Sequence, residues 1–293
     1  MTLKGNSYEQ LQRSHPCFGG HVNNAGRIHL PVSPGCNIAC RFCDRVINDT
    51  ENRPGVTSKV VKPEETVDIL RKALDICPEI RVAGIAGPGD TLNTDYALET
   101  FRLVKKEFPD LLKCMSTNGL LLDEKADELI DVGIDSLTVT VNAVDPKIEA
   151  KINKYVIWHG VRYDGEQGAA ILIGNQLKGI RKVTAAGMTV KVNTVLVPEI
   201  NGDHIGEVAK AAADAGASIY NIIPLIPQHE MASFRAPTCA EIEAARQEAG
   251  KYIDVFRHCQ HCRADAVGVP GVSEFGDRIY QQRVGTKETF SHG

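Results

Sequence analysis

Apolar runs of strand length alternate with stretches of helical periodicity along most of the chain. The runs are bounded by turn residues, and the longer stretches space their apolar residues like an amphipathic helix. The predicted strands are residues 27–33, 80–87, 111–119, 135–143, 188–197 and 218–227. The predicted helices are residues 62–77, 95–108, 123–133, 169–187, 203–216 and 239–256. About six strand–helix units predict an α/β fold with a parallel sheet curled into a partial or full barrel; a flat doubly wound sheet is the alternative.

Three stretches depart from this alternation. Residues 146–165 have no regular period and are predicted to be irregular. Residues 1–26 and 256–293 are predicted to be N- and C-terminal extensions of a barrel that spans residues 27–255. Both extensions carry cysteines.

Composition and charge narrow the class of protein. The chain has 293 residues, a formal net charge of −4, 24% charged and 43% hydrophobic residues. A negative net charge disfavours nucleic-acid and membrane partners, because both usually select a basic surface. No apolar run approaches the roughly 20 residues that span a bilayer. The polar N-terminus lacks the apolar centre of a signal peptide, so we expect a cytoplasmic protein.

The nine cysteines indicate metal binding or catalysis. Their number is odd, and cytosolic thiols are kept reduced, so disulfides are disfavoured. Cys36, Cys40 and Cys43 directly follow the first predicted strand, at the end where barrel enzymes place their chemistry. Three thiolates can hold three irons of a [4Fe–4S] cluster and leave the fourth iron open. A structural zinc ion, the alternative, needs a fourth protein ligand.

The CxxxCxxC spacing, with the aromatic Phe42 before the last cysteine, resembles the signature of the radical S-adenosylmethionine (SAM) enzymes. The resemblance implies a partial (βα)6 TIM-type barrel whose terminal extensions close over the barrel mouth. It also implies that SAM binds the open iron and is cleaved to a 5′-deoxyadenosyl radical.

The ends of later strands resemble other parts of the SAM site in this family. AGPGD at 86–90 takes the place of the family's Gly-Gly-Glu-like motif, but it has a proline between the glycines and an aspartate as its acid. Hydroxyl and amide groups at the following strand ends suit ribose and carboxylate; ordinary turn capping is the alternative. The expected cofactor contacts are Phe42, Gly87, Gly89, Asp90, Ser116, Thr117 and Asn193.

The cysteines of the two extensions suggest a second cluster. Cys17 has no local partner, and Cys259 and Cys262 form a CxxC pair, which considered alone also fits half a zinc knuckle or a redox pair. If the two chain ends meet at the barrel, the three thiols form another open site. His29 and Cys114 lie on predicted strands, where a core position is the alternative.

The order of motifs at 14–17, 27–45, 51–56, 86–90, 116–120, 221–227 and 259–268 is similar to that of the radical SAM enzymes that build the nitrogenase cofactor core. The resemblance implies fusion of two [4Fe–4S] clusters, with carbide and a ninth sulfur, into an [8Fe–9S–C] precursor. One SAM would donate a methyl group to a cluster sulfide, and a second would supply the radical that removes hydrogen from it, in lyase-type chemistry. Some relatives carry an additional C-terminal domain. This sequence ends soon after the motif at 259–268, so we expect the short, stand-alone form.

The same resemblance implies three clusters and their ligands. Cys36, Cys40 and Cys43 would hold the radical-generating cluster, and Cys17, Cys259 and Cys262 one substrate cluster. His29 and Cys114 would hold the other, with Asp49 or Glu51 as its third ligand. Glu51 and Arg53 are also the candidate catalytic residues; a loop salt bridge is their alternative.

The expected partners are iron–sulfur cluster donors, a reductant, and a downstream carrier or scaffold protein. Two other functions stay open. A radical SAM enzyme with auxiliary clusters could modify a peptide or small molecule. A non-enzymatic scaffold would bind clusters without cleaving SAM.

Overall fold

The computed structural model describes residues 8–19, 24–280 and 288–289. Eight strands form its main sheet, in the order β12-β11-β10-β7-β6-β5-β1-β13. Seven of them run parallel, and β13 pairs antiparallel with β1. The strands are β1 (Gly26–His29), β5 (Ile80–Ile85), β6 (Leu112–Thr117), β7 (Ser136–Thr140), β10 (Thr189–Leu196), β11 (Ile219–Pro224), β12 (Val255–Phe256) and β13 (Val267–Gly268). The edge strands β12 and β13 do not pair, so the predicted partial barrel is confirmed and is open along one side.

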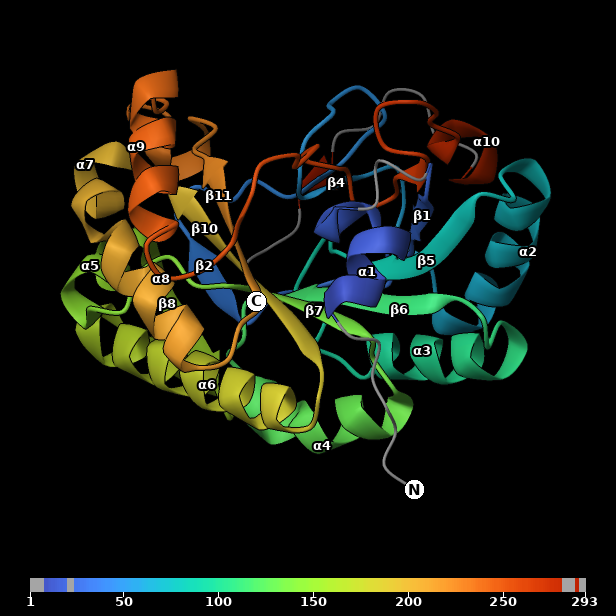
Figure 1. The fold of residues 1–293 in the computed structure, drawn as a ribbon, viewed down its shortest axis with the longest axis horizontal. Coiled ribbons are helices and arrows are strands. Elements are labelled where there is room, and N and C mark those ends of the chain that lie inside the picture. The colour runs from blue at the N-terminus through green and yellow to red at the C-terminus, as the bar shows by residue number, and fades with distance from the viewer. Residues whose placement is uncertain (1–7, 20–23, 281–287, 290–293) are drawn as a thin grey trace.

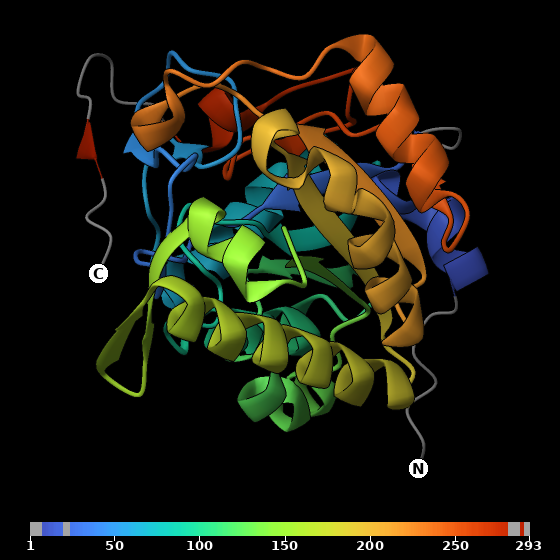
Figure 2. The same ribbon diagram turned by 90° about the vertical axis from the view of Figure 1, so that its left-hand side faces the viewer.

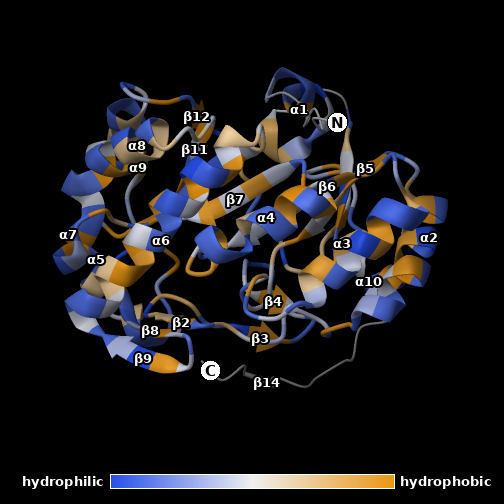
Figure 3. Cartoon of the chain, turned by 90° about the horizontal axis from the view of Figure 1, so that it is seen from below, coloured by the Kyte–Doolittle hydropathy of each residue, from blue (hydrophilic) through white to orange (hydrophobic). Residues whose placement is uncertain are grey.

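Helices follow the parallel strands and cover the outside of the curved sheet (Figure 1). They are α2 (Thr66–Ile76), α3 (Tyr96–Glu107), α4 (Leu122–Val132), α6 (Gly165–Ala185), α8 (Ile205–Asp214) and α9 (Cys239–Ala249). Strands β5, β6 and β7 carry apolar segments beneath these helices (Figure 3). The six predicted strand–helix units are therefore present. Among the described residues, no helix is both long and apolar enough to cross a bilayer.

Strands β1, β7 and β10 place mainly apolar residues on one face and polar residues on the other. Ile28, Met115 and Val190 belong to the core that packs against the helices. The alternate positions face the barrel interior, and the strand register aligns His29 with Gly84 and Gly84 with Cys114. We call this interior the lumen; its polar lining residues are His29, Cys114, Ser116, Ser136, Thr138, Thr140, Lys191, Asn193 and Asn221. A TIM barrel is usually filled by bulky apolar side chains. A polar lining indicates a space built for a polar or charged ligand.

Residues 146–165 are regular, contrary to the prediction. They form α5 (Pro146–Ile152), β8 (Asn153–Trp158) and β9 (Val161–Asp164), after which α6 begins. Asp145 caps α5 by accepting the Lys147 N–H, and residues 159 and 160 turn the hairpin with positive φ. The hairpin projects from the body (Figure 2). Strand β8 also pairs with β2 (Ile38–Cys40), which lies far away in the sequence.

The last predicted helix, residues 239–256, is shorter than expected. Helix α9 ends at Ala249, and Val255–Phe256 forms the edge strand β12. Gly250 follows the helix with a φ of −62°, and its N–H still donates to the Arg246 carbonyl. The remaining elements are short: α1 (Tyr8–Ser14), η1 (Pro16–Phe18), β3 (Val46–Ile47), β4 (Val56–Thr57), η3 (Pro63–Glu65), α7 (Pro198–Asn201), η4 (Gly202–His204), η5 (His229–Met231), α10 (Gly276–Tyr280) and β14 (Glu288–Thr289).

The two terminal extensions meet at the sheet. Leu11 and Phe18 of the N-terminal segment form an apolar cluster with Ile219 and Phe256, against which Leu112 packs. Leu112 and Ile219 are the first residues of β6 and β11, so the N-terminal segment contacts the amino ends of these strands; we had expected it over the mouth. The C-terminal extension adds β13 to the sheet. The division at residues 26 and 256 stays a prediction.

Candidate functional site

Cys36, Cys40 and Cys43 lie together after β1, on the loop that contains β2. All three are partly exposed free thiols, and the Cys43 N–H donates to the Cys40 carbonyl at 3.1 Å. Burial raises the pKa of each thiol, that of Cys43 to about 11. The Arg45 guanidinium acts in the opposite direction on all three, so it stabilises their thiolate forms.

These three thiols supply the donor set of a cubane cluster. Each thiolate of such a cluster binds a different iron, and three thiolates leave the fourth iron without a protein ligand. The donor set of three cysteines with one open iron therefore suits the cluster that the radical SAM family implies.

The turn after β5 packs directly on the cysteine loop. A Cβ atom on Gly89 would lie 2.0 Å from the Gly35 carbonyl oxygen, so only glycine fits this contact. The Gly89 N–H donates to the Ser33 carbonyl, and the Asp90 N–H donates to the Gly35 carbonyl, both at 2.8 Å. Gly87 has a φ of 122° that also favours glycine. The glycines of AGPGD thus bring this turn against the triplet.

Asp90 is buried, and protein groups surround its carboxylate. It accepts the N–H groups of Leu92 and Asn118, at 3.0 and 2.6 Å, and the Thr117 hydroxyl at 3.0 Å. Burial raises its pKa, and these hydrogen bonds act in the opposite direction. Asp90 and Thr117 therefore fasten the turns after β5 and β6 to each other.

The other expected cofactor contacts lie in two places. Ser116 faces the lumen from β6, and its carbonyl accepts the Thr91 hydroxyl at 2.7 Å. Asn193 accepts from the Asn221 amide at 3.1 Å across the lumen wall. Phe42 packs against a separate apolar cluster that contains Leu225 and Met231. Whether these residues contact SAM stays a prediction.

Cys17, Cys259 and Cys262 converge, although more than 200 residues separate Cys17 from the pair. Burial raises the pKa of Cys17 to about 12, and Cys262, Cys114 and Cys259 are all close enough to add to that effect. Burial also acts to raise the pKa of Cys259, but hydrogen bonds with His261 lower it to about 7. Cys262 accepts a hydrogen bond from Arg27 Nη2 at 3.3 Å. The structure thus brings this predicted ligand set together.

His29 and Cys114 face the lumen from neighbouring positions on either side of Gly84. His29 Nδ1 lies 2.9 Å from the Arg263 carbonyl oxygen. Burial and the charge of Arg27 lower the pKa of His29 to about 4, so its imidazole is neutral near pH 7. A neutral imidazole held at Nδ1 by a carbonyl presents Nε2 as an acceptor or metal ligand.

Glu51 and Arg53 form the loop salt bridge that was the alternative to a catalytic role. Glu51 Oε2 lies 2.7 Å from Arg53 Nη2, and its Oε1 accepts from Asn48 at 2.9 Å. Arg263 donates to the Glu51 carbonyl, which connects this loop to the residue that holds His29. A role for either residue in catalysis, and for Asp49 or Glu51 as a ligand, stays a prediction.

Several residues of the site were not among the expected ligands or cofactor contacts. Arg45 acts on the triplet, Asn118 Nδ2 lies 3.7 Å from Cys36 Sγ, and Arg27 contacts Cys262. Lys191 is within electrostatic reach of Cys17, Cys114 and Cys259. Position on an alternating strand could have indicated Arg27 and Lys191, because they share a face with His29 and Asn193.

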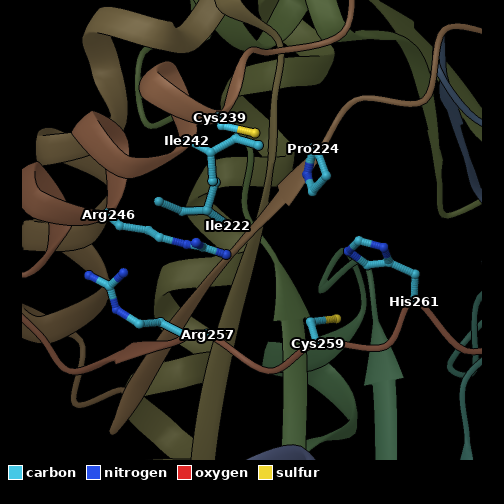
Figure 4. A pocket seen from close by; sticks show the side chains of 8 residues that line it. All are labelled: Ile222, Pro224, Cys239, Ile242, Arg246, Arg257, Cys259 and His261. Atoms are coloured by element: carbon cyan, nitrogen blue, oxygen red, sulfur yellow. The ribbon is translucent and has the colours of Figure 1, made fainter. Parts of the chain in front are cut away.

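Two hollows flank the CxxC segment. One, of about 170 Å³, lies between α9 and the segment; its walls include Cys239, Arg246, Cys259 and His261 (Figure 4). The other, of about 370 Å³, includes Arg27 and Cys262. The segment that carries Cys259 and Cys262 therefore borders open space on two sides.

Comparison with known proteins identifies the class. The family model of the radical SAM superfamily matches residues 30–212, and the chain belongs to that superfamily. Membership implies a [4Fe–4S] cluster and SAM. A protein of Methanocaldococcus infernus named "FeMo cofactor biosynthesis protein NifB" is 46% identical over 96% of this chain and 93% of its own length. The protein of that name from Klebsiella pneumoniae is 40% identical, and the match covers 88% of this chain and 57% of the relative. Within the superfamily, the chain belongs to the NifB family.

Solved structures agree with this fold. A radical SAM methyltransferase from Sphaerobacter thermophilus superposes with a TM-score of 0.58 at 17% identity, over 84% of this chain and 68% of that chain. SuiB from Streptococcus suis, bound to S-adenosylmethionine, gives 0.59 at 14% identity, over 87% of this chain and 56% of that chain. At these identities, the likeness concerns the fold alone.

Proposed function

We propose that this enzyme fuses two [4Fe–4S] clusters, with carbide and a ninth sulfur, into the [8Fe–9S–C] precursor of the nitrogenase cofactor. The observation that carries the proposal is the packing of Cys17 and Cys259 on one apolar cluster, with Cys114 and Cys262 within electrostatic reach of Cys17. Because Cys17 is within electrostatic reach of Cys114 as well as of the CxxC pair, two substrate clusters held by these two ligand sets would be neighbours. The names of the 38–46% identical relatives support the same pathway.

Cys36, Cys40 and Cys43 would hold the resident cluster, next to the turn formed by residues 86–90. When bound, this cluster and SAM supply a methyl group and a 5′-deoxyadenosyl radical. Gly89 gives that turn its close approach to the cysteine loop, and Asp90 fixes the turn to the end of β6. Asn193 and Asn221 pair on the polar lumen wall and add amide groups to it.

The substrate clusters would be held by ligands of different strength. Cys17, Cys259 and Cys262 supply thiolates, whereas His29 supplies a neutral imidazole, which binds iron less strongly than a thiolate. A weaker ligand suits a cluster that must leave its site during fusion. The proposal includes three clusters per chain, a cytoplasmic location, and cluster donors, a reductant and a carrier or scaffold protein as partners.

Anaerobic reconstitution tests the proposal. Iron, sulfide and 5′-deoxyadenosine would be measured in the wild-type protein and in Cys17→Ala and Cys259→Ala. Three cubane clusters predict about twelve irons per chain, with a loss of about four in each variant. Cys239→Ala is the matched control, because Cys239 is exposed and outside every proposed ligand set. It should keep the wild-type iron content.

Turnover separates this function from its alternatives. Addition of SAM and reductant should produce 5′-deoxyadenosine together with loss of the separate cluster signals. About four irons in the wild-type protein, unchanged in both variants, would leave a radical SAM enzyme without cluster fusion. Iron binding without cleavage of SAM would indicate a scaffold.

A further inference from the structure

Lys191 places a buried ammonium group at the junction of the two terminal extensions. Its side chain lies on the lumen face of β10, and the residue is 5% exposed. Lys191 Nζ donates to the Cys17 carbonyl oxygen at 3.2 Å. The nitrogen also lies 5.2 Å from the ring centres of Phe18 and Phe256, within cation–π range. One residue thus contacts both the N-terminal segment and the strand that leads into the CxxC segment.

Two other buried cations on strands of the main sheet have carboxylate partners, and Lys191 differs from them. Arg27 pairs with Glu274 at 3.3 Å, and Lys113 pairs with Asp135 at 3.3 Å. Among the described side chains, no carboxylate forms an ion pair with Lys191. A carbonyl and two aromatic rings only partly replace the water that a buried ammonium loses. The charge of Lys191 therefore calls for an anion in the lumen.

The groups around Lys191 are those predicted to hold the substrate clusters. Burial raises the pKa of Cys17 and Cys114, and the Lys191 ammonium acts in the opposite direction on both. It also acts to lower the pKa of Cys259 and of His29. Members of both ligand sets are thus within electrostatic reach of this one charge.

We propose that Lys191 is the counter-ion of the substrate clusters, a positioning residue that holds their negative charge between the two ligand sets. A [4Fe–4S] core of charge 2+ bound by three thiolates carries net negative charge, so cluster and ammonium compensate each other in the lumen. The inference rests on the proposed function only in that clusters occupy these ligands; it does not require fusion. One-electron reduction makes the cluster more negative, so Lys191 also favours the reduced state.

The test compares Lys191→Met, which removes the charge from a side chain of similar length, with Lys191→Arg, which keeps it. Lys113→Met is the matched control, because Lys113 is equally buried but lies on the helix-facing side of β6. All would be made together with Cys36→Ala, Cys40→Ala and Cys43→Ala, so that only substrate clusters contribute signals. The clusters would be reconstituted anaerobically and titrated with dithionite under EPR, without SAM. Thermal unfolding of each metal-free variant would check folding.

Lys191→Met should lower the equilibrium constant for one-electron reduction at least tenfold, which corresponds to about 59 mV for one electron. It should also lose iron to a chelator several-fold faster, whereas Lys191→Arg and Lys113→Met should match the parent. Loss of all iron in Lys191→Met with retention in Lys191→Arg would equally support a role of the charge. An unchanged reduction potential in Lys191→Met, or equal changes in Lys191→Met and Lys191→Arg, would overturn the counter-ion role of Lys191. A parent protein that binds no iron would overturn both the role of Lys191 and the proposed function. Clusters that bind but do not fuse would overturn only the proposed function.

Discussion

Asp90 accepts the backbone N–H of Asn118 at 2.6 Å, and this buried bond joins the turn after β5 to the turn after β6. Asn118 in turn reaches Cys36 Sγ and donates to the Asn37 side chain at 2.7 Å. The acid of the AGPGD motif therefore acts on the cysteine loop through Asn118.

Asp90→Asn should weaken this connection. The amide of asparagine offers one acceptor oxygen where the carboxylate offers two, so a buried donor loses its partner, at a cost of about 1–3 kcal/mol. Thermal unfolding should show the loss, and reconstituted iron on the triplet should fall. Asp95→Asn is the control, because Asp95 is an exposed carboxylate paired with Lys125. Equal stability of the two variants would contradict the connecting role of Asp90.

Gly89→Ala should separate the turn from the cysteine loop. The new methyl group would overlap the Gly35 carbonyl, and relieving such overpacking typically costs about 1–3 kcal/mol. SAM binding, measured by equilibrium dialysis on the reconstituted protein, should weaken at least several-fold. Gly174→Ala in α6 has open space around its added Cβ and should be neutral or slightly stabilising. Wild-type SAM affinity in Gly89→Ala would show that the close approach is dispensable.

Asp49 and Glu51 are the two candidates for the third ligand of the His29–Cys114 cluster, and substituting each should show which of them binds iron. Glu51 is connected through Arg263 to His29, so Glu51→Gln should remove more iron from the His29–Cys114 site than Asp49→Asn does. Iron per chain and the EPR signals of the substrate clusters, in protein that lacks the triplet cysteines, provide the measurement. The reverse order would identify Asp49 as the ligand.

Glu149 should make the stability of the metal-free protein depend on pH. Burial raises its pKa from an ordinary 4.5 to about 7, so the native state binds this proton more tightly than the unfolded chain. Stability from this group is fully present below pH 4.5 and is lost as the pH rises to about 7. The loss is roughly 3 kcal/mol at about 1.4 kcal/mol per pKa unit.

Glu149→Gln should remove that loss. Denaturant unfolding of both proteins between pH 4.5 and 8 isolates the contribution, because every other titrating group is shared. The difference in unfolding free energy should shift in favour of the variant as the pH rises. Parallel curves would show that Glu149 ionises in the native protein as it does in the unfolded chain.

The sequence was sufficient for features that depend on local pattern. Six strand–helix units follow from periodicity, and the triplet from spacing within ten residues. The hairpin Asn153–Asp164 was missed because β8 pairs with β2, more than 100 residues away, and such a partner leaves no periodic signal. Lys191 was missed for a related reason. Polar and apolar residues alternate along residues 191–195 (KVNTV) in the same way whether the polar face of the strand is exposed to water or lines the lumen. The curvature of the sheet and the path of the N-terminal segment determine whether that polar face is exposed to solvent or lines the lumen.

The helix-facing and lumen-facing positions of the strands should tolerate different kinds of substitution, in evolution and in engineering. On the helix-facing side, Ile28, Val190 and their neighbours need only suitable volume, so apolar exchanges there should be tolerated with compensating changes. One residue further along the same strands, a change of charge or polarity alters what the lumen can hold. In a saturation library, tolerance should therefore switch on and off at every second position of β1, β6 and β10. That alternation would mark the lumen in a variant map without any bound cluster.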